Sequence, residues 1–273
     1  MIRSFPGCLA LLGIFFQCGG TLQAHDLWLQ TNTTVVRTGD AVHIDCMLGN
    51  HGNDHRDFKL AGKPAIESVK DLAVVLPDGT RRNLGAELAD LGMAPKDGYL
   101  ATRFVTGKAG VHLVAHTADR VVNHGTPIRS LRSAKCAFVA STLLDKVPAQ
   151  LTGFDRVLGH RLELVPDCDL VNLGPGTALK VRLLLDGKPA PGVKVSFIPR
   201  GVTLREGTDS EYERVTDKEG RASFSPRVGT YHLIAAHLKT SEKGTVAGQA
   251  YDATQYSATF TVLVPQQCPC CDD

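Results

Sequence analysis

The sequence lacks an apolar stretch long enough to cross a membrane as a helix, which would need about 20 residues. The apolar run at residues 8–16 is too short, and no later stretch comes closer to that length. The chain also lacks a strong net charge, because its 30 lysines and arginines nearly balance its 28 aspartates and glutamates. These absences predict a protein with no stable membrane insertion and no nucleic-acid partner.

Sequence motifs of common catalytic sites are missing as well. The chain has no Gly-x-Ser-x-Gly turn, no His-Glu-x-x-His zinc helix, no phosphate-binding loop and no dinucleotide fingerprint. Pairs of carboxylates such as Asp167 and Asp169 occur, but paired carboxylates are common in turns and need not do acid–base chemistry. We therefore expect that the protein is not an enzyme.

The first 24 residues have the features of an export signal. Arg3 provides a positive charge, the apolar run follows, and Leu22-Gln23-Ala24 ends in the small residue that signal peptidase requires. We expect a signal peptide at residues 1–24 and a periplasmic or secreted mature protein that begins at His25. A lipid anchor at Cys18 is the less favoured alternative, because Phe16-Gln17 is a poor match to the small residues expected before a lipidated cysteine.

Six cysteines follow the predicted cleavage site, and their spacing is irregular. Cys46 and Cys136 lie in apolar strand patterns, which predicts either core thiols or one disulfide bridge between them. The tail at residues 266–273 holds Cys268, Cys270 and Cys271. We expect the tail cysteines to be disordered thiols or to form one bridge to Cys168, in preference to a soft-metal clip.

The remainder of the chain has the pattern of short strands. Apolar and polar residues alternate with period two after Leu27, and Gly and Pro separate the segments without a long helical period. The predicted strands of the first half are residues 41–48, 71–76, 99–105, 111–117 and 135–141. Those of the second half are residues 161–165, 178–185, 193–199, 212–216, 221–224, 230–236 and 256–264. We predict an all-β protein made of two antiparallel β-sandwich domains, at residues 25–145 and 155–265, with the boundary in the irregular stretch 144–159.

The segment from Leu48 to Asp57 concentrates groups that bind metal ions. It holds His51 and His55 with two carboxylates, and its glycines and asparagines predict a loop at the end of a strand. A loop can bring two imidazoles four residues apart to one point, and clustered imidazoles outside a strand favour a transition-metal site. A polar loop whose side chains only cap turns is the alternative.

Two further histidines are candidate ligands. Cleavage after Ala24 would leave His25 with a free amine beside its ring, and such a nitrogen chelate favours copper or nickel. His124 lies in another predicted loop and is the best additional candidate. A histidine that begins a mature chain is also similar to the copper monooxygenases that act on polysaccharides, an interpretation that we rank below a binding role.

The other histidines fail a geometric test for a shared ion. His112 and His116 have the same parity on one predicted strand, but four residues of strand separate them by about 13 Å. His232 and His237 have opposite parity and are expected to face different sides of their strand. His43, on a polar strand face, and His160, at the start of the second half, are expected to be solvated.

Two resemblances complete the sequence analysis. Residues 183–197, 216–222 and 229–233 resemble the carboxypeptidase-regulatory, immunoglobulin-like β-sandwich, a fold that says nothing about function. The sequence from His25-Asp26-Leu27-Trp28-Leu29 through Asn50-His51-Gly52 to this sandwich resembles an exported bacterial family of unknown function. Some members of that family are described as periplasmic components of nickel or cobalt uptake systems, the NikK-like group.

The second resemblance implies metal handling. We expect an exported protein that binds nickel, cobalt or copper at His25, His51, His55 and His124 and passes the ion to a membrane transporter. The alternative is a structural module of the cell envelope that binds protein or carbohydrate without a metal. The sequence leaves open the choice of metal, the pairing of the cysteines and the oligomeric state.

Overall fold

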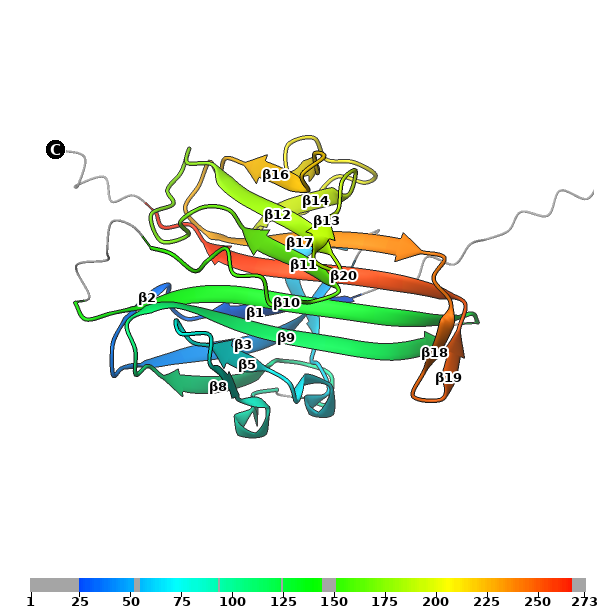
Figure 1. Ribbon diagram of the computed structural model, residues 1–273, viewed down its shortest axis with the longest axis horizontal. Helices are drawn as coiled ribbons and strands as arrows, with labels where there is room; N and C mark the ends of the chain where they lie inside the picture. Colours follow the sequence, from blue (N-terminus) through cyan, green and yellow to red (C-terminus); the bar gives the residue numbers. More distant parts are fainter. Residues whose placement is uncertain (1–24, 52–54, 93, 124, 144–150, 267–273) are drawn as a thin grey trace, which may run out of the picture.

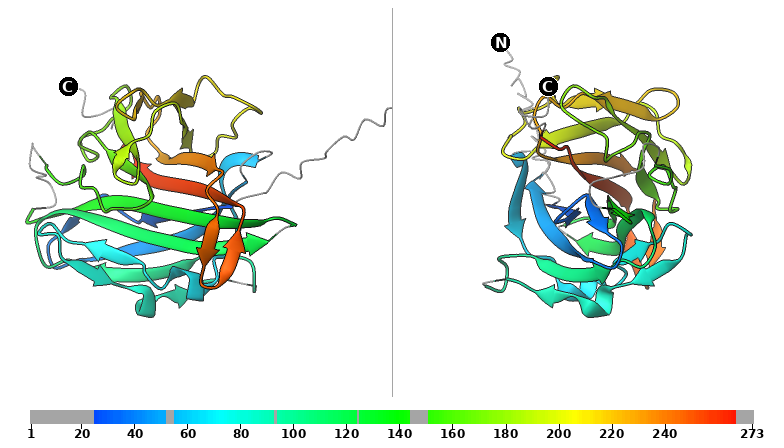
Figure 2. Two further views of the ribbon diagram at one scale, coloured as in Figure 1. Left: turned by 45° about the vertical axis from the view of Figure 1, so that its right-hand side comes forward. Right: turned by 90° about the vertical axis from the view of Figure 1, so that its left-hand side faces the viewer.

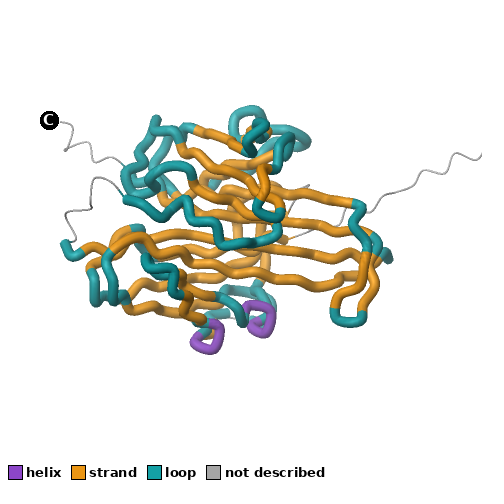
Figure 3. The backbone as a smooth tube through the Cα atoms, viewed as in Figure 1, coloured by secondary structure: helices purple, strands orange, loops and turns teal. Residues whose placement is uncertain are grey.

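The computed structural model describes residues 25–51, 55–92, 94–123, 125–143 and 151–266. Regular structure in this part of the chain is almost entirely β-strand, and most neighbouring strands run antiparallel (Figure 3). Two single-turn 3-10 helices, η1 (Ile66–Val69) and η2 (Gly85–Glu87), lie in the first half. None of the helices in the described ranges is long and apolar enough to span a bilayer. The prediction of an all-β fold is confirmed.

The first sheet belongs to the N-terminal half. Its strands are β1 (His25–Thr31), β3 (Ala41–His51), β4 (His55–Gly62), β7 (Ala89–Asp90) and β8 (Leu100–Val105). Their order is β1-β3-β8-β7, and β4 pairs with the C-terminal end of β3. On β3, Val42, Ile44 and Cys46 are buried while His43 is exposed, which is the predicted period-two pattern.

The central sheet has nine strands and runs through both halves of the chain (Figure 1). Its strands are β2 (Val35–Arg37), β5 (Ala73–Val75), β6 (Arg81–Asn83), β9 (Gly110–Asn123), β10 (Pro127–Ser141), β14 (Lys194–Pro199), β15 (Glu213–Val215), β17 (Tyr231–Thr240) and β20 (Ala253–Leu263). The order is β15-β14-β17-β20-β10-β9-β5-β6, with β2 also beside β10. β10 of the first half and β20 of the second half pair in parallel. One continuous sheet thus joins the two predicted domains, and the domain boundaries themselves stay a prediction.

The third sheet covers the C-terminal part of the central sheet. It contains β11 (Leu162–Pro166), β12 (Leu179–Leu185), β13 (Lys188–Pro189) and β16 (Arg221–Phe224). β12 lies between β11 and β16 and pairs antiparallel with both. A separate hairpin of β18 (Gly244–Val246) and β19 (Gln249–Tyr251) projects between β17 and β20. Most of the longer strands thus lie near the predicted positions, while β4, β18, β19 and the short strands β2, β6, β7 and β13 were not predicted.

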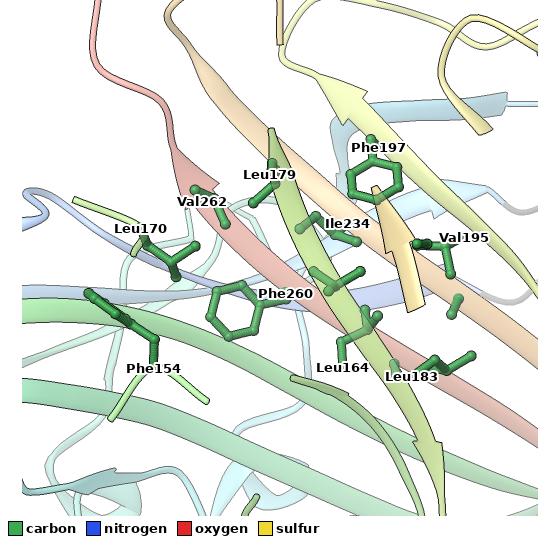
Figure 4. Packing of buried hydrophobic residues seen from close by; sticks show 14 of the residues in the cluster. Phe154, Leu164, Leu170, Leu179, Leu183, Val195, Phe197, Ile234, Phe260 and Val262 are labelled. Atoms are coloured by element: carbon green, nitrogen blue, oxygen red, sulfur yellow. The ribbon is translucent and has the colours of Figure 1, made fainter. Parts of the chain in front are cut away.

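Side chains alternate between the two faces of the central sheet, and each face packs against a core. On β10, Leu131 and Val139 belong to the core shared with the third sheet, whereas Ala134, Cys136 and Phe138 belong to the core shared with the first sheet. The core shared with the third sheet is rich in large apolar side chains, including those from β11, β12, β14, β17 and β20 that Figure 4 labels. Each such side chain contributes about 1.5–3 kcal/mol when fully buried. The first and third sheets therefore lie on opposite faces of the central sheet (Figure 2).

A buried ion pair also connects the third sheet to the central one. Nζ of Lys135 on β10 lies 2.7 Å from a carboxylate oxygen of Glu163 on β11, and both side chains are essentially inaccessible to solvent. The same carboxylate accepts hydrogen bonds from the backbone N–H groups of Leu158, Gly159 and His160. Burial alone would raise the pKa of Glu163, but Lys135 and these donors outweigh burial and hold the pKa below its usual value.

Candidate functional site

Strand pairing in the first sheet brings three of the predicted metal ligands to neighbouring backbone positions. His25, the first residue of β1, is the Cα partner of His51 on β3, and His51 is the Cα partner of His55 on β4. Such partners lie about 4.5–5.5 Å apart between Cα atoms. Positions 25, 51 and 55 therefore form one row across three strands, which we call the histidine corner. The side chains of His51 and His55 and all of His124 lie outside the described residues.

The predicted loop from Leu48 to Asp57 is wrong, because both ends of this segment are β-strand. β3 continues through His51, and β4 begins at His55, so the two histidines occupy paired strand positions. Gly49 lies inside this hairpin, where a Cβ atom would come within 1.9 Å of the Lys59 carbonyl oxygen and 2.8 Å of the Trp28 ring. The glycine that suggested a loop is thus needed for close packing of strands, a use that spacing alone does not reveal.

An ion pair between the two halves lies next to the histidine corner. Asp26 on β1 is fully buried, and its two carboxylate oxygens lie 2.8 and 3.0 Å from Nε2 of His237 on β17. The His237 side chain is 37% exposed. Burial alone would lower the pKa of His237, but the charge of Asp26 and its hydrogen bond outweigh burial and raise the pKa. The contact therefore joins β17 of the second half to the start of β1.

Two arginines flank this ion pair. Arg132 on β10 is the register partner of Ser257 on β20, which in turn is the partner of His237. Burial and the charge of Arg120 lower the pKa of Arg132, while the charge of Asp26 acts in the opposite direction. On the other side, Arg56 of β4 forms an ion pair with Glu213 and donates hydrogen bonds to the backbone oxygens of two residues after β14. Asp26 therefore has cationic neighbours on β10 and β4 in addition to His237.

The remaining histidines have separate environments. His112 is buried, stacks on Phe138 with ring centroids 4.8 Å apart, and has Nδ1 3.0 Å from the Gly110 carbonyl oxygen. His116 is buried and bonded to Asp71, and His43 is exposed as predicted. His232 is buried whereas His237 is exposed, which confirms that the two face different sides.

His160 is the exception to the predictions for the isolated histidines. It was expected to be solvated, but its side chain is buried, and neither ring nitrogen has a hydrogen-bond partner among the residues that the structure describes. The pKa of His160 is lowered to about 4, mainly by burial; the charges of Lys135 and Arg81 act in the same direction, and those of Glu163 and Asp71 oppose them. Its place directly before β11, under the third sheet, explains the burial.

The described cysteines do not form a metal site. Cys46 and Cys136 are buried free thiols, consistent with the predicted core positions, and Cys168 is a partly exposed free thiol. The predicted cysteine tail lies almost wholly outside the described residues. Among the residues that the structure describes, no group of three or more histidine, cysteine, aspartate or glutamate side chains has a geometry that could hold a metal ion.

Two cavities are separate from the histidine corner. The larger, of about 860 Å³, lies between the ends of β14 and β16 and is lined by residues that include Tyr212, Phe224 and Arg227. The smaller, of about 260 Å³, includes Ser133 and His160 in its wall. Neither cavity is lined by His25, Asp26 or His237. The side chain of His25 itself is partly exposed at the protein surface.

Sequence analysis missed Asp26 and His237 as partners. Asp26 stands beside the candidate ligand His25, which is a usable signal, but nothing local connects it with a residue more than two hundred positions later. The alternation of side chains along β17 correctly puts His237 and His232 on different faces, but it does not tell which other strand packs against each face. The contact between Asp26 and His237 depends on how β1 packs against the central sheet, which the whole fold determines.

Comparison with solved structures finds only distant likeness. The Yersinia pseudotuberculosis adhesin InvE is 16% identical with a TM-score of 0.24, over 89% of this chain and 61% of the adhesin chain. The ectodomain of mouse nectin-like molecule 4 is 11% identical with a TM-score of 0.21, over 89% and 65% of the two chains. A mutant Salmonella alpha-2-macroglobulin is 16% identical with a TM-score of 0.25, over 88% and 15%. The chain thus spans about three fifths of the length of the adhesin structure, and likeness at this level carries no functional information.

Comparison of sequences is more informative about family. No curated protein matches the chain. A family model described as a domain of unknown function, DUF4198, matches residues 22–240. This match includes β1, β3, β4 and β17, the strands that carry the histidine corner and His237. Because the match extends over most of the sequence, the chain belongs to the DUF4198 family.

Proposed function

We propose that this protein is exported, captures a transition-metal ion, and passes the ion to a membrane transporter. The ion is nickel, cobalt or copper, and its ligands are His25, His51 and His55, with His124 as a further contributor. The single observation that carries the proposal is the strand register, which brings position 25 next to position 51, itself the partner of position 55, although position 25 is distant from both in sequence. The NikK-like resemblance adds the expectation of nickel or cobalt uptake.

The donor atoms suit these ions. Imidazole nitrogen binds nickel, copper and cobalt well, and the amine released by cleavage after Ala24 would add a second nitrogen from residue 25. Both donors must lose a proton to bind, so affinity is expected to fall as the pH falls. The partial exposure of the His25 side chain favours exchange of the ion with a partner.

The proposal gives the second half of the chain a supporting role. Residues 155–265 would form an immunoglobulin-like sandwich of the carboxypeptidase-regulatory type, and residues 25–145 would form the sandwich that holds the ion. Parallel pairing of β10 with β20 supports a fixed relation between these two parts. The second sandwich would then hold the first in place or offer a docking surface to the transporter.

Calorimetric titration with nickel and copper tests the proposal. The protein should begin at His25, which mass spectrometry of the secreted form can establish. We expect binding to the wild-type protein and a loss of affinity of at least about tenfold, or 1.4 kcal/mol, in His51→Ala and in a form with one extra N-terminal residue. His43→Ala is the matched control, since His43 is an exposed histidine of the same strand. Unchanged affinity in both altered forms would remove the proposed ligands and favour a metal-free scaffold of the cell envelope.

A further inference from the structure

The larger cavity lies between two edge strands of the C-terminal half. Within the described residues, β15 pairs only with β14 of the central sheet, and β16 pairs only with β12 of the third sheet. The cavity between them has a volume of about 860 Å³, within the range of about 300–1,000 Å³ that is usual for small-molecule sites. Ser223, Ser225 and Arg227 of its wall are exposed, so a small molecule can enter from solvent.

Much of the wall is aromatic or apolar. Phe224, the last residue of β16, is buried, and its ring stacks on that of Phe197 with centroids 5.3 Å apart. The ring centroid of Tyr212, directly before β15, lies 6.0 Å from that of Phe224. Val202 and Val228 also line the cavity, and Val228 is 55% exposed. The cavity therefore offers apolar contacts to a molecule that contains a ring.

The charged residues of the wall are three arginines and one glutamate. Arg227 forms an ion pair with that glutamate, Glu211, at 3.4 Å. The guanidinium of Arg200 lies over two aromatic rings, 4.7 and 4.8 Å from their centroids, and donates a hydrogen bond to Gln30 of β1. Both of these arginines are thus already engaged by side chains, and Arg214 is the third.

Arg214 points into the space between the central and third sheets. It is the Cα partner of Val195 on β14, and Val195 belongs to the core shared with the third sheet. Side chains of such partners lie on the same face of a sheet. The Arg214 guanidinium accordingly lies 5.7 Å from the centroid of the Phe224 ring. Its hydrogen bonds go to three backbone oxygens of residues 210–213, and no carboxylate of the described residues forms an ion pair with it.

This arrangement leaves the positive charge of Arg214 without a negative partner in the described part of the chain. The three backbone oxygens orient the guanidinium but carry no net charge. They occupy both N–H groups of Nη1 and one of Nη2, so one N–H of Nη2 and that of Nε are left. These two donors lie side by side on the planar fork, which is the geometry that binds a carboxylate at two points. An inward-facing strand position is normally apolar, so an arginine there favours an anionic ligand.

We propose that this cavity binds an aromatic organic acid, whose acid group contacts Arg214 and whose ring packs against Tyr212 and Phe224. A neutral ring would leave the guanidinium without a counter-charge, and a small inorganic anion would leave the aromatic wall uncovered. The hydroxyl groups of Ser210 and Ser223, which also line the cavity, would donate further hydrogen bonds to the acid group. This inference goes beyond the proposed function and does not depend on a metal.

Fluorescence titration of the full chain tests the proposal with anilinonaphthalene sulfonate as the probe. Its neutral analogue, N-phenylnaphthylamine, has the same rings without the acid group. We expect saturable binding of the sulfonate, and Arg214→Met should weaken it at least about tenfold because a charge-assisted contact is lost. Arg214→Met should leave the affinity for the neutral analogue almost unchanged, which separates loss of the charge from loss of the fold. Arg214→Lys keeps the charge without the fork and should fall between the two.

Arg221→Met is the matched control. Arg221 is an exposed arginine of β16 that pairs with Asp167 and does not line the cavity. Its replacement should leave the affinity for anilinonaphthalene sulfonate unchanged. Equal affinity for the sulfonate in wild type and Arg214→Met would overturn the proposal, and so would an equal loss of the neutral analogue.

A measurement on the wild-type protein does not depend on the folding of variants. With aromatic rings labelled for NMR, phenylbutyrate should shift the ring signals of Tyr212 and Phe224 and leave that of Tyr251, on β19, unchanged. The amide of the same acid should shift them far less, because it lacks the negative charge. Equal shifts by acid and amide, or the absence of saturable binding of either anion, would overturn the proposal.

Discussion

Lys135–Glu163 and Asp26–His237 are two of the ion pairs that connect strands of different sheets, and they differ in their exposure to solvent. Lys135 and Glu163 are both inaccessible to solvent, and the carboxylate also accepts three backbone N–H groups. Asp26 is equally buried, but its partner His237 is 37% exposed. The first pair is shielded from solvent on both sides, whereas the second is open to solvent at the histidine.

The largest effect on the free energy of unfolding is expected when the Lys135–Glu163 ion pair is broken. Lys135→Met leaves the Glu163 carboxylate buried without its counter-charge, which should cost about 3–5 kcal/mol of unfolding free energy. The double variant Lys135→Met with Glu163→Leu should recover much of this loss, because it removes both charges. Urea denaturation measures both values. Lys108→Met is the control, since Lys108 and its partner Asp78 are largely exposed and should give no resolvable change.

A loss close to zero in Lys135→Met would contradict the comparison. It would mean that the buried pair does not stabilise the contact between the central and third sheets. The two pairs would then differ in exposure alone, and exposure would not decide how much each pair stabilises the fold.

A smaller effect on stability is expected from the protonation of His160, which lies beside Glu163 in the same region. His160 is buried with its pKa lowered to about 4, so the folded protein resists its protonation whereas the unfolded chain does not. The stability that this histidine contributes should be complete above about pH 6.5 and should be lost as the pH falls towards 4, by roughly 3 kcal/mol. Denaturation curves across this range test the expectation.

Two variants show whether His160 is the cause. His160→Gln should flatten the dependence of unfolding free energy on pH between about 6.5 and 4. His43→Ala removes an exposed histidine and should leave the slope as it is. An equal slope in wild type and in His160→Gln would assign the acid sensitivity to another group.

The smallest effect on stability is expected when the Asp26–His237 pair is changed. In the absence of metal, His237→Gln should change the free energy of unfolding by less than about 1 kcal/mol, because the ring is partly exposed and the amide can still donate to Asp26. Thermal or urea denaturation of the metal-free protein provides the value. A loss as large as that of Lys135→Met would show that His237 is mainly structural.

Local sequence patterns predict much of the fold because burial on a strand repeats every second residue. The alternation at Val42, Ile44 and Cys46 is readable in the sequence and is present on β3. The hairpin from β3 to β4 was missed because glycines and asparagines near Gly49 normally indicate a loop. Here the glycine permits a close contact with Trp28 that only the folded arrangement explains.

Contacts between distant segments could not be predicted in the same way. Parallel pairing of β10 with β20 depends on how both halves fold around one sheet, and no local pattern specifies it. His160 was predicted to be solvated because its burial comes from strands far along the chain. His51 and His55 were selected from local composition and His25 from the predicted cleavage site, whereas the contact between Asp26 and His237 could be found only in the folded structure.

The metal content of the protein, purified without an affinity tag from its native compartment, tests the central claim most directly. Elemental analysis by mass spectrometry should find close to one nickel, cobalt or copper ion per chain, and the amount should fall when His51 is replaced by alanine. A native protein free of these metals, which also fails to retain nickel or copper after incubation and desalting, would contradict the account.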